Sequence, residues 1–191
     1  MLKIFGVFLF VMTVCSLVGS AKNNCPTIKT KNQWAGKAAT DVTYQVRPIR
    51  YVVIHHTASD PCSTFVECAE LIQGIQNYQM TDLEYDDIGY NFLIGNDGNV
   101  YEGTGWGVRG SHSYGYNMNG TGIAFIGNFI KKLPTRAALD AAKKLLECGV
   151  KKGELDRHYK LLGGLQVIST QSPGLTLYNE IQEWDHWVST P

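Results

Sequence analysis

The sequence has no excess of charge of either sign, since it holds 17 Lys and Arg residues and 17 Asp and Glu residues. A neutral chain lacks the positive field that bulk binding to nucleic acid or to an anionic membrane surface requires. The sequence also has no internal repeat and no low-complexity linker, which favours a single domain. Any ligand must therefore be recognised by local groups.

A long apolar run occurs only at the start of the chain. Residues 1–3 include one lysine, residues 4–17 carry no charge, and residues 18–21 suit a signal peptidase. This pattern is typical of a secretory signal peptide and is too short to span a membrane comfortably. We expect residues 1–21 to be removed and residues 22–191, about 170 residues, to form one soluble, secreted domain.

The cysteines include no CxxC pair, which disfavours a zinc site built from thiolates. Cys15 lies in the expected signal peptide, and the four remaining cysteines predict two disulfides in an oxidising compartment. Three pairings of these four are possible. We expect the short-loop pair Cys62–Cys68 at the start of a helix, and Cys25–Cys148 between the N-terminal arm and a late helix.

Strands and helices alternate along the chain. β-Branched and aromatic runs bounded by turn residues predict strands at 48–54, 90–94, 100–102, 122–126 and 166–169. Apolar residues at helical spacing predict helices at 65–80, 135–150 and 175–184. This order is typical of an α/β fold with a mixed central β-sheet flanked by helices.

Polar residues gather in four segments, which are residues 55–57, 87–91, 105–112 and 163–174. The third lies in a loop of residues 103–120, which contains six glycines with Trp, Tyr, His and Asn, and long loops in compact domains are usually functional. Alternation along a strand points neighbouring side chains to opposite faces, so His55 and His56 should diverge. We expect the four segments to meet at one end of the sheet.

Taken in this order, the segments resemble the peptidoglycan recognition proteins, which share their fold with phage-type N-acetylmuramoyl-L-alanine amidases. The matching stretches are residues 51–57, 87–92, 100–103, 122–128 and 172–174. The resemblance runs from Cys25 to Trp187 and is greatest to short secreted insect members that activate the Toll pathway. It implies an amidase-like fold and a secreted innate-immune receptor for bacterial peptidoglycan.

Catalytic members of that family hold one zinc ion with two His and one Cys, and add a Tyr and a Thr. By this resemblance His55, Tyr90 and Thr170 match, while Gly164 and Ser172 replace the second His and the Cys. A catalytic zinc ion needs about three protein ligands before its bound water can yield hydroxide at neutral pH. We therefore expect no cofactor, no metal and no amidase activity, with His55 as the vestige of a ligand.

Two enzymatic alternatives stay open. One is an active zinc-dependent amidase whose ligand set is completed by another histidine. The other is a slow serine-based peptidoglycan carboxypeptidase, because the hydroxyl of Ser172 near His55 could act as a nucleophile. A secreted binding module with an unrelated ligand is a further alternative.

A groove for peptidoglycan needs flat aromatic faces, hydrogen-bonding side chains and a few cations. By the match to the family groove, the residues expected to contact the polymer are His55, His56, Thr57, Tyr90, Asn91, Trp106, Arg109, Ser111, His112, Thr170 and Ser172. Arg109 could pair with a stem-peptide carboxylate. Two alternatives stay open, because Trp106 could anchor the loop in the core and Arg109 could be a solvated surface charge.

The resemblance favours the lysine-type cell wall of Gram-positive bacteria. Some diaminopimelate binders carry an arginine where Thr170 stands, although Gly105–Trp106 is similar to a pair associated with such binders. The resemblance also implies, as signalling partners in body fluid, a glucan-binding-type recognition protein and a serine protease cascade. Asn119 begins an Asn-Gly-Thr acceptor for glycosylation.

Overall fold

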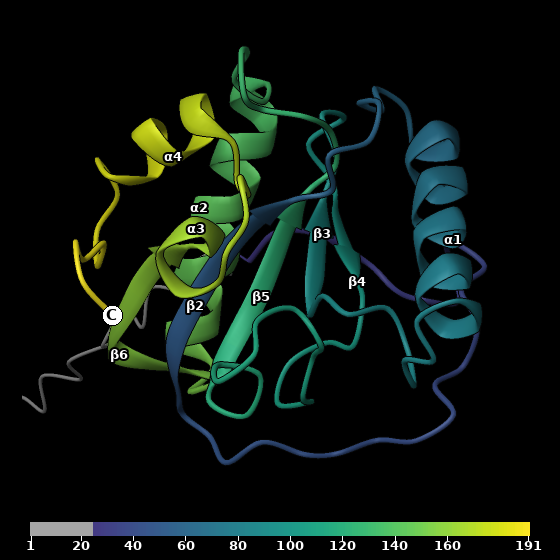
Figure 1. The fold of residues 1–191 in the computed structure, drawn as a ribbon, viewed down its shortest axis with the longest axis horizontal. Helices are drawn as coiled ribbons and strands as arrows, with labels where there is room; N and C mark the ends of the chain where they lie inside the picture. The colour runs from purple at the N-terminus through teal and green to yellow at the C-terminus, as the bar shows by residue number, and fades with distance from the viewer. Residues whose placement is uncertain (1–24) are drawn as a thin grey trace, which may run out of the picture.

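The structure, a computed structural model, describes residues 25–191, so the expected signal peptide lies outside the described residues. Six strands form one mixed sheet in the order β1-β4-β3-β5-β2-β6 (Figure 1). The strands are β1 (Ile28–Lys29), β2 (Ile49–His56), β3 (Phe92–Ile94), β4 (Val100–Glu102), β5 (Gly120–Phe125) and β6 (Leu155–Gly163). The helices are α1 (Phe65–Thr81), α2 (Arg136–Lys151), α3 (Gly164–Val167) and α4 (Leu175–Ile181). The predicted α/β class is confirmed.

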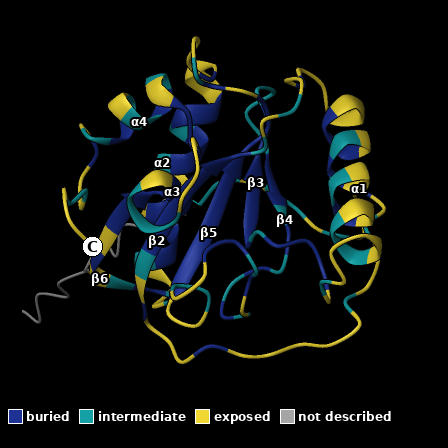
Figure 2. Ribbon diagram, viewed as in Figure 1, coloured by how far each residue is buried: buried dark blue, intermediate teal, exposed yellow. Residues whose placement is uncertain are grey.

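Alternate residues of the strands build two apolar clusters, one on each face of the sheet. Val52, Ile54 and Phe92 belong to the larger cluster, which α2 and α4 complete. Leu93 and Ala124 belong to the smaller cluster, which α1 completes. We call these the α2 face and the α1 face. Figure 2 shows the buried strands between α2, behind the sheet, and α1, beside β4.

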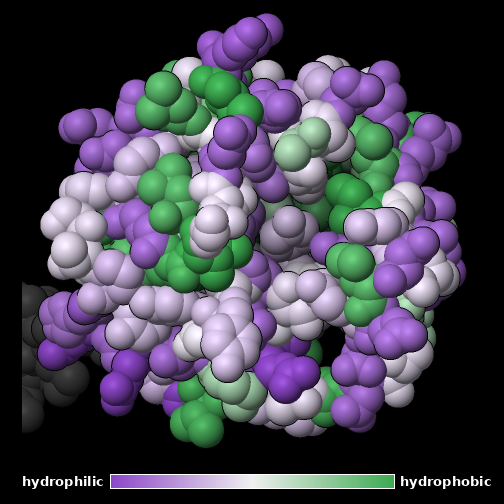
Figure 3. Space-filling view, in the orientation of Figure 1, coloured by the Kyte–Doolittle hydropathy of each residue, from purple (hydrophilic) through white to green (hydrophobic). Residues whose placement is uncertain are grey.

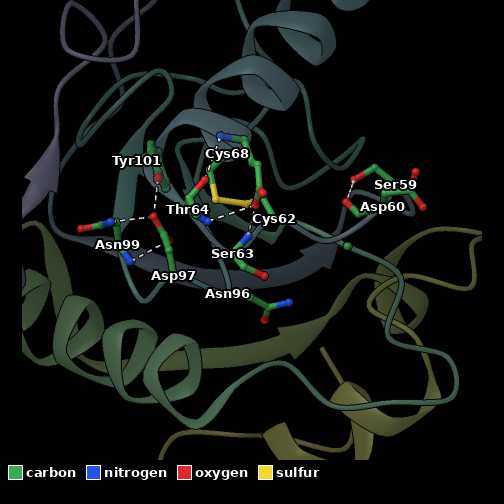
Figure 4. Close-up of a disulfide and its surroundings, with 12 residues drawn as sticks. Ser59, Asp60, Cys62, Ser63, Thr64, Cys68, Asn96, Asp97, Asn99 and Tyr101 are labelled. Carbon is green, nitrogen blue, oxygen red and sulfur yellow. Dashed lines mark hydrogen bonds between the residues drawn. A yellow bond between two sulfur atoms is a disulfide. The ribbon is translucent and has the colours of Figure 1, made fainter.

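The start of α1 is fixed by local chemistry. The Thr64 side chain accepts from the backbone N–H of Glu67, and the Glu67 carboxylate accepts from that of Thr64, which completes a capping box. The disulfide Cys62–Cys68 joins the preceding turn to the first turn of the helix, beside Asp97 (Figure 4). This end of α1 is therefore held both covalently and by backbone capping.

The other helix of comparable length, α2, begins after the N-cap Thr135, whose hydroxyl accepts from the Ala138 N–H. Its last turns carry Cys148, which forms a disulfide with Cys25 across a sequence separation of 123. The N-terminal arm is thereby tied to the α2 face. The two disulfides are the two expected pairs.

The edge of the sheet beyond β2 differs from expectation. The strand predicted at 166–169 is wrong, because residues 164–167 form the short helix α3, in which Gln166 accepts from the Gly163 N–H. The edge strand is instead β6, where exposed Arg157 and Lys160 flank buried Tyr159. Charged residues are common on edge strands because they discourage pairing with other chains.

None of the helices within residues 25–191 is long and apolar enough to cross a membrane.

Candidate functional site

The two histidines at the end of β2 point to opposite faces of the sheet. The ring of His55 lies on the α1 face and is only 3% exposed. His56 lies on the α2 face, where its Nδ1 accepts from the backbone N–H of Phe129 at 3.2 Å. Only His55 is therefore placed to belong to a polar site on the α1 face.

The ring of His55 is held at both nitrogens by serine hydroxyls. Its Nδ1 lies 3.2 Å from the Ser172 Oγ, and its Nε2 lies 3.0 Å from the Ser113 Oγ. The same Ser113 Oγ lies 3.2 Å from the Nδ1 of His112. Ser113 was not among the residues predicted from sequence, although it directly follows His112 in the glycine-rich loop.

Glycines make room for this network on the face of the sheet. A Cβ atom at Gly122 of β5 would lie 2.4 Å from the ring of His112, closer than real Cβ contacts allow. The loop can therefore bring His112 and Ser113 over β5 only because residue 122 has no side chain. This explains why a loop residue reaches the end of β2.

Ser172 is fixed from two further directions. Its Oγ accepts from the backbone N–H of His56 at 2.9 Å, and its own backbone N–H donates to the Thr170 Oγ1 at 3.2 Å. Ser172 is 7% exposed, whereas Thr170 is exposed. Thr170 thus lies at the solvent side of the site and holds the turn that presents Ser172.

Burial sets the protonation of the site. Desolvation, with the His112 and His56 rings as smaller causes, lowers the pKa of His55 to about 3. Desolvation likewise lowers the pKa of His112 to about 4, while the Gly120 carbonyl acts in the opposite direction. Desolvation, and after it Tyr85, raises the pKa of Tyr90 to about 12. At neutral pH both imidazoles are uncharged and the Tyr90 phenol keeps its proton.

The residues present do not fit a catalytic zinc ion. Gly164 offers no ligand atom, and a Cβ atom there would lie 2.7 Å from the His55 Nδ1. That nitrogen is already bonded to Ser172, whose neutral hydroxyl is a poor substitute for a thiolate. Within the described residues no group of three or more His, Cys, Asp or Glu side chains could hold a metal ion.

A hollow of about 390 Å³ lies beside this network, between α1 and the strand ends. Thr57 and Tyr90 form one side of it, and the ring of Tyr90 lies 5.7 Å from that of His55. The helix side is formed by Glu70, Leu71, Gly74, Ile75, Tyr78 and Gln79. Figure 3 shows apolar patches over α3 and beside α1, on either side of a recessed centre. We call this hollow the α1 groove.

The α1 side of the groove was not predicted from sequence. A signal for it exists, because Glu70, Gly74 and Tyr78 repeat at a spacing of four and are exposed, opposite the buried stripe of the helix. Gly74 leaves open space, since no atom lies within 4 Å of the position its Cβ would take. The α1 groove is therefore open at this part of the helix.

Three residues expected to contact the polymer lie elsewhere. His56 faces the α2 core, as described above. Trp106 packs its ring 4.5 Å from that of Phe92 and against Gly149 of α2, so it anchors the loop on the α2 face. Asn91 is fully buried, and its side chain bonds to the loop. Its amide donates to Thr104, Gly105 and Val108, and its oxygen accepts from the Gly122 N–H.

Two other expected residues line a separate small hollow. Arg109 is exposed and Ser111 is half-buried, and both border a space of about 100 Å³ that also contains Asp86 and Asp87. Ser111 donates its backbone N–H to the Gly89 carbonyl, so this hollow adjoins the segment that carries Tyr90. Asn119 is exposed just before β5 begins.

Comparison with known proteins agrees with this architecture. A family model described as N-acetylmuramoyl-L-alanine amidase matches residues 45–175. Peptidoglycan-recognition protein SA of Drosophila melanogaster is 67% identical over 168 residues, which cover 88% of this chain and 83% of that protein. The chain belongs to the peptidoglycan recognition protein family. The resemblance inferred from sequence is confirmed.

Other members of the peptidoglycan recognition protein family agree in sequence and in structure. The solved structure of Drosophila protein SA has a TM-score of 0.86 and covers 87% of this chain and 96% of that one. Peptidoglycan-recognition protein 2 of Holotrichia diomphalia is 46% identical, with both chains fully covered. Recognition protein LE, solved with tracheal cytotoxin, a monomeric diaminopimelic acid-type peptidoglycan, is 41% identical with a TM-score of 0.83, covering 84% and 95% of the two chains.

Proposed function

We propose that this chain is a secreted receptor that binds bacterial peptidoglycan in the α1 groove and has no zinc amidase activity. The observation that carries the proposal is the groove itself, in which Tyr90 and Thr57 lie beside the buried His55. Stem peptide and sugar would lie between α1 and these residues. Gly164 and Ser172 stand where the family resemblance implies two zinc ligands in catalytic members. The bound tracheal cytotoxin of protein LE supports a peptidoglycan fragment as the ligand class.

The proposed polymer is the lysine-type wall. Thr170 is exposed at the solvent side of Ser172, and no cation stands at that position to pair with the extra carboxylate of diaminopimelate. Gly105–Trp106 is similar to a pair associated with diaminopimelate binders. It is a weak argument for that wall type here, because the Trp106 ring packs on the α2 face. Arg109 is an exposed cation in the hollow that adjoins the Tyr90 segment and would pair with a carboxylate common to both wall types.

Sedimentation with insoluble peptidoglycan tests this function. The mature protein is mixed with lysine-type or diaminopimelate-type polymer, each with and without added zinc. We expect more protein in the lysine-type pellet and no effect of zinc. A clear preference for diaminopimelate overturns the specificity, no sedimentation overturns the function, and one zinc per chain in the purified protein overturns the metal-free site.

A matched pair of variants locates the binding surface. Tyr90→Ala removes the ring at the side of the α1 groove, and we expect at least about tenfold weaker binding, equivalent to about 1.4 kcal/mol. Tyr44→Ala removes a ring that is 74% exposed outside the groove and should bind normally. Equal binding by both variants would place the polymer elsewhere.

A second function is favoured by one specific distance, the 3.2 Å between the Ser172 Oγ and the His55 Nδ1. Ser172 could attack a stem-peptide carbonyl while its proton passes to His55, and that proton would then reach the leaving amine as the C–N bond breaks. Water would hydrolyse the resulting ester with the same base and release a carboxylate. An imidazole with a pKa of about 3 is a weak base at neutral pH, so turnover would be slow.

A time course of muropeptides tests this serine chemistry. The native protein should shorten the stem peptide over hours, and Ser172→Ala should give the trace of the buffer alone. Identical traces for both proteins would exclude the chemistry while leaving binding untouched.

The receptor would pass its signal to a glucan-binding-type protein and a serine protease that activates Toll signalling, and a pull-down with these components is the test of that step.

A further inference from the structure

Four buried polar side chains form a single hydrogen-bonded chain on the α1 face. The order is Ser172, His55, Ser113 and His112, with successive contacts of 3.2, 3.0 and 3.2 Å. Their exposed fractions are 7%, 3%, 2% and 8%. Each hydroxyl and each neutral imidazole has one hydrogen to donate, so fixing one contact fixes the direction of all three.

The direction is decided at Ser172. Its oxygen already accepts from the backbone N–H of His56. Among the described residues, the other partner of this hydroxyl is the Nδ1 of His55. A buried hydroxyl whose hydrogen finds no acceptor is costly, so Ser172 must donate to that nitrogen.

The remaining contacts follow from this choice. If Nδ1 of His55 accepts, its Nε2 carries the hydrogen and donates to the Ser113 Oγ. Ser113 then donates to the Nδ1 of His112, whose own hydrogen lies on Nε2. Among residues 25–191 that nitrogen is buried without a hydrogen-bond partner of ordinary geometry, while the Gly120 carbonyl acts on the His112 ring as an acceptor. Because Nδ1 is occupied by Ser113, we assign this carbonyl to the Nε2 hydrogen. The reverse direction would leave the Ser172 hydrogen without an acceptor and turn a lone pair of His112 toward a carbonyl oxygen.

We propose that Ser113 and His112 form a positioning relay that holds His55 in the tautomer protonated at Nε2, with Nδ1 facing Ser172 as a hydrogen-bond acceptor. Ser113 is the central element because it is the acceptor for one ring and the donor for the other. Neither Ser113 nor His112 needs to touch a ligand for this role. Asn117 supports the relay, since its side-chain oxygen accepts from the backbone N–H groups of both His112 and Ser113.

The chemical consequence rests on the serine-based function proposed above, while the tautomer does not. In this tautomer the lone pair of Nδ1 can receive the Ser172 proton, which is what a general base must do. In the other tautomer Nδ1 would carry a hydrogen and could take up no proton from Ser172. The relay therefore determines whether the pair of Ser172 and His55 is competent for chemistry.

Nitrogen NMR of the mature protein labelled with ¹⁵N-histidine tests the relay at neutral pH without peptidoglycan. Nδ1 of His55 should show the shift of an unprotonated ring nitrogen, and Nε2 that of a protonated one. The opposite assignment overturns the proposal. Because no ligand or substrate is present, a chain that neither binds nor cuts peptidoglycan would still give the expected spectrum.

Variants of Ser113 separate positioning from simple packing. Ser113→Ala removes the acceptor for Nε2. Either tautomer then leaves one buried hydrogen without an acceptor, on Nε2 of His55 or on Ser172, and we expect His55 to populate both. Ser113→Thr keeps the hydroxyl and should restore the native pattern, and Ser189→Ala removes an exposed hydroxyl and should not change it. If Ser113→Ala keeps the native tautomer in full, or Ser113→Thr fails to restore it, the relay is excluded.

Discussion

The two faces of the sheet differ in how they are closed. On the α2 face, two helices complete one large cluster of buried apolar residues. On the α1 face, one helix beside β4 and β3 completes a smaller cluster, and the rest is covered by loop residues lying over Gly122 and beside Gly164 (Figures 1 and 2). Small residues on a strand surface cost apolar burial but admit polar side chains from elsewhere. Most apolar burial thus lies on one face, while the proposed binding groove lies on the other.

The largest expected difference between the faces concerns their disulfides. Replacing both Cys25 and Cys148 by Ser should lower the free energy of unfolding by about 5 kcal/mol, since the bond closes a loop of 123 residues in the unfolded chain. Replacing Cys62 and Cys68, a separation of 6, should cost about 2 kcal/mol. Urea unfolding of the two double variants measures both values, and a reversed order would contradict this division of stability.

Trp106 tests which face a loop residue serves. Trp106→Ala should destabilise the protein by about 3 kcal/mol, because it opens a cavity against Phe92 and α2. The folded fraction should sediment with peptidoglycan as well as the native protein does. A variant that has native stability but no longer sediments would show that Trp106 contributes to peptidoglycan binding and not to the packing of the α2 face.

Asn91 tests how the loop is held between the faces. Asn91→Asp keeps the shape but removes the amide hydrogens that Thr104, Gly105 and Val108 accept, and we expect a loss of about 2 kcal/mol. Asn128→Asp is the control, because that residue is exposed and acts through its oxygen toward the Ile130 N–H. Thermal unfolding of both variants checks the difference, and equal melting temperatures would be inconsistent with a structural Asn91.

The buried histidines of the α1 face predict an acid-sensitive fold. Their folded pKa values, about 3 and about 4, lie below the unfolded value of 6.5, so the unfolded state binds more protons between these limits. Stability from each is therefore complete above about pH 6.5 and falls as pH decreases, by about 1.4 kcal/mol per pH unit for each histidine. Unfolding free energies measured between pH 7 and pH 4 check this slope.

One substitution assigns part of that slope to His112. His112→Gln should remove about one histidine's share of the decrease in unfolding free energy per pH unit. An unchanged slope in His112→Gln would show that its ring is charged in the folded protein or does not contribute.

The sequence predicted the regular elements well because their signals are local. Thr135 marks the start of α2, and the bounds of α1 lie within one residue of the predicted 65–80. β6 was missed because Arg157, His158 and Lys160 interrupt the alternation of apolar and polar residues that predicts a strand. Exposed charged residues at these positions make sense only once the strand is known to lie at the edge of the sheet. The predicted strand at 166–169 reflected β propensity, which the Gln166 cap of α3 overrides.

The site was predicted less completely because it depends on a loop. Strand alternation correctly separated His55 from His56. A glycine-rich loop has no such period, so nothing in the sequence says that Trp106 turns to one face while Ser113 turns to the other. Those directions are set by contacts with Phe92 and His55, which are distant along the chain.

The close approach of His55 to Gly164 bears on whether a single substitution at residue 164 could introduce a metal ligand. Any side chain introduced at residue 164 meets the imidazole at 2.7 Å, so His55 must first leave the contacts with Ser113 and Ser172 that hold it. A ligand side chain introduced there alone would thus be a packing defect before it could bind a metal ion. Building a metal site at this point would need residues 55, 113, 164 and 172 to change their arrangement together. The space that Gly164 leaves to the imidazole is therefore a barrier to stepwise change at this site.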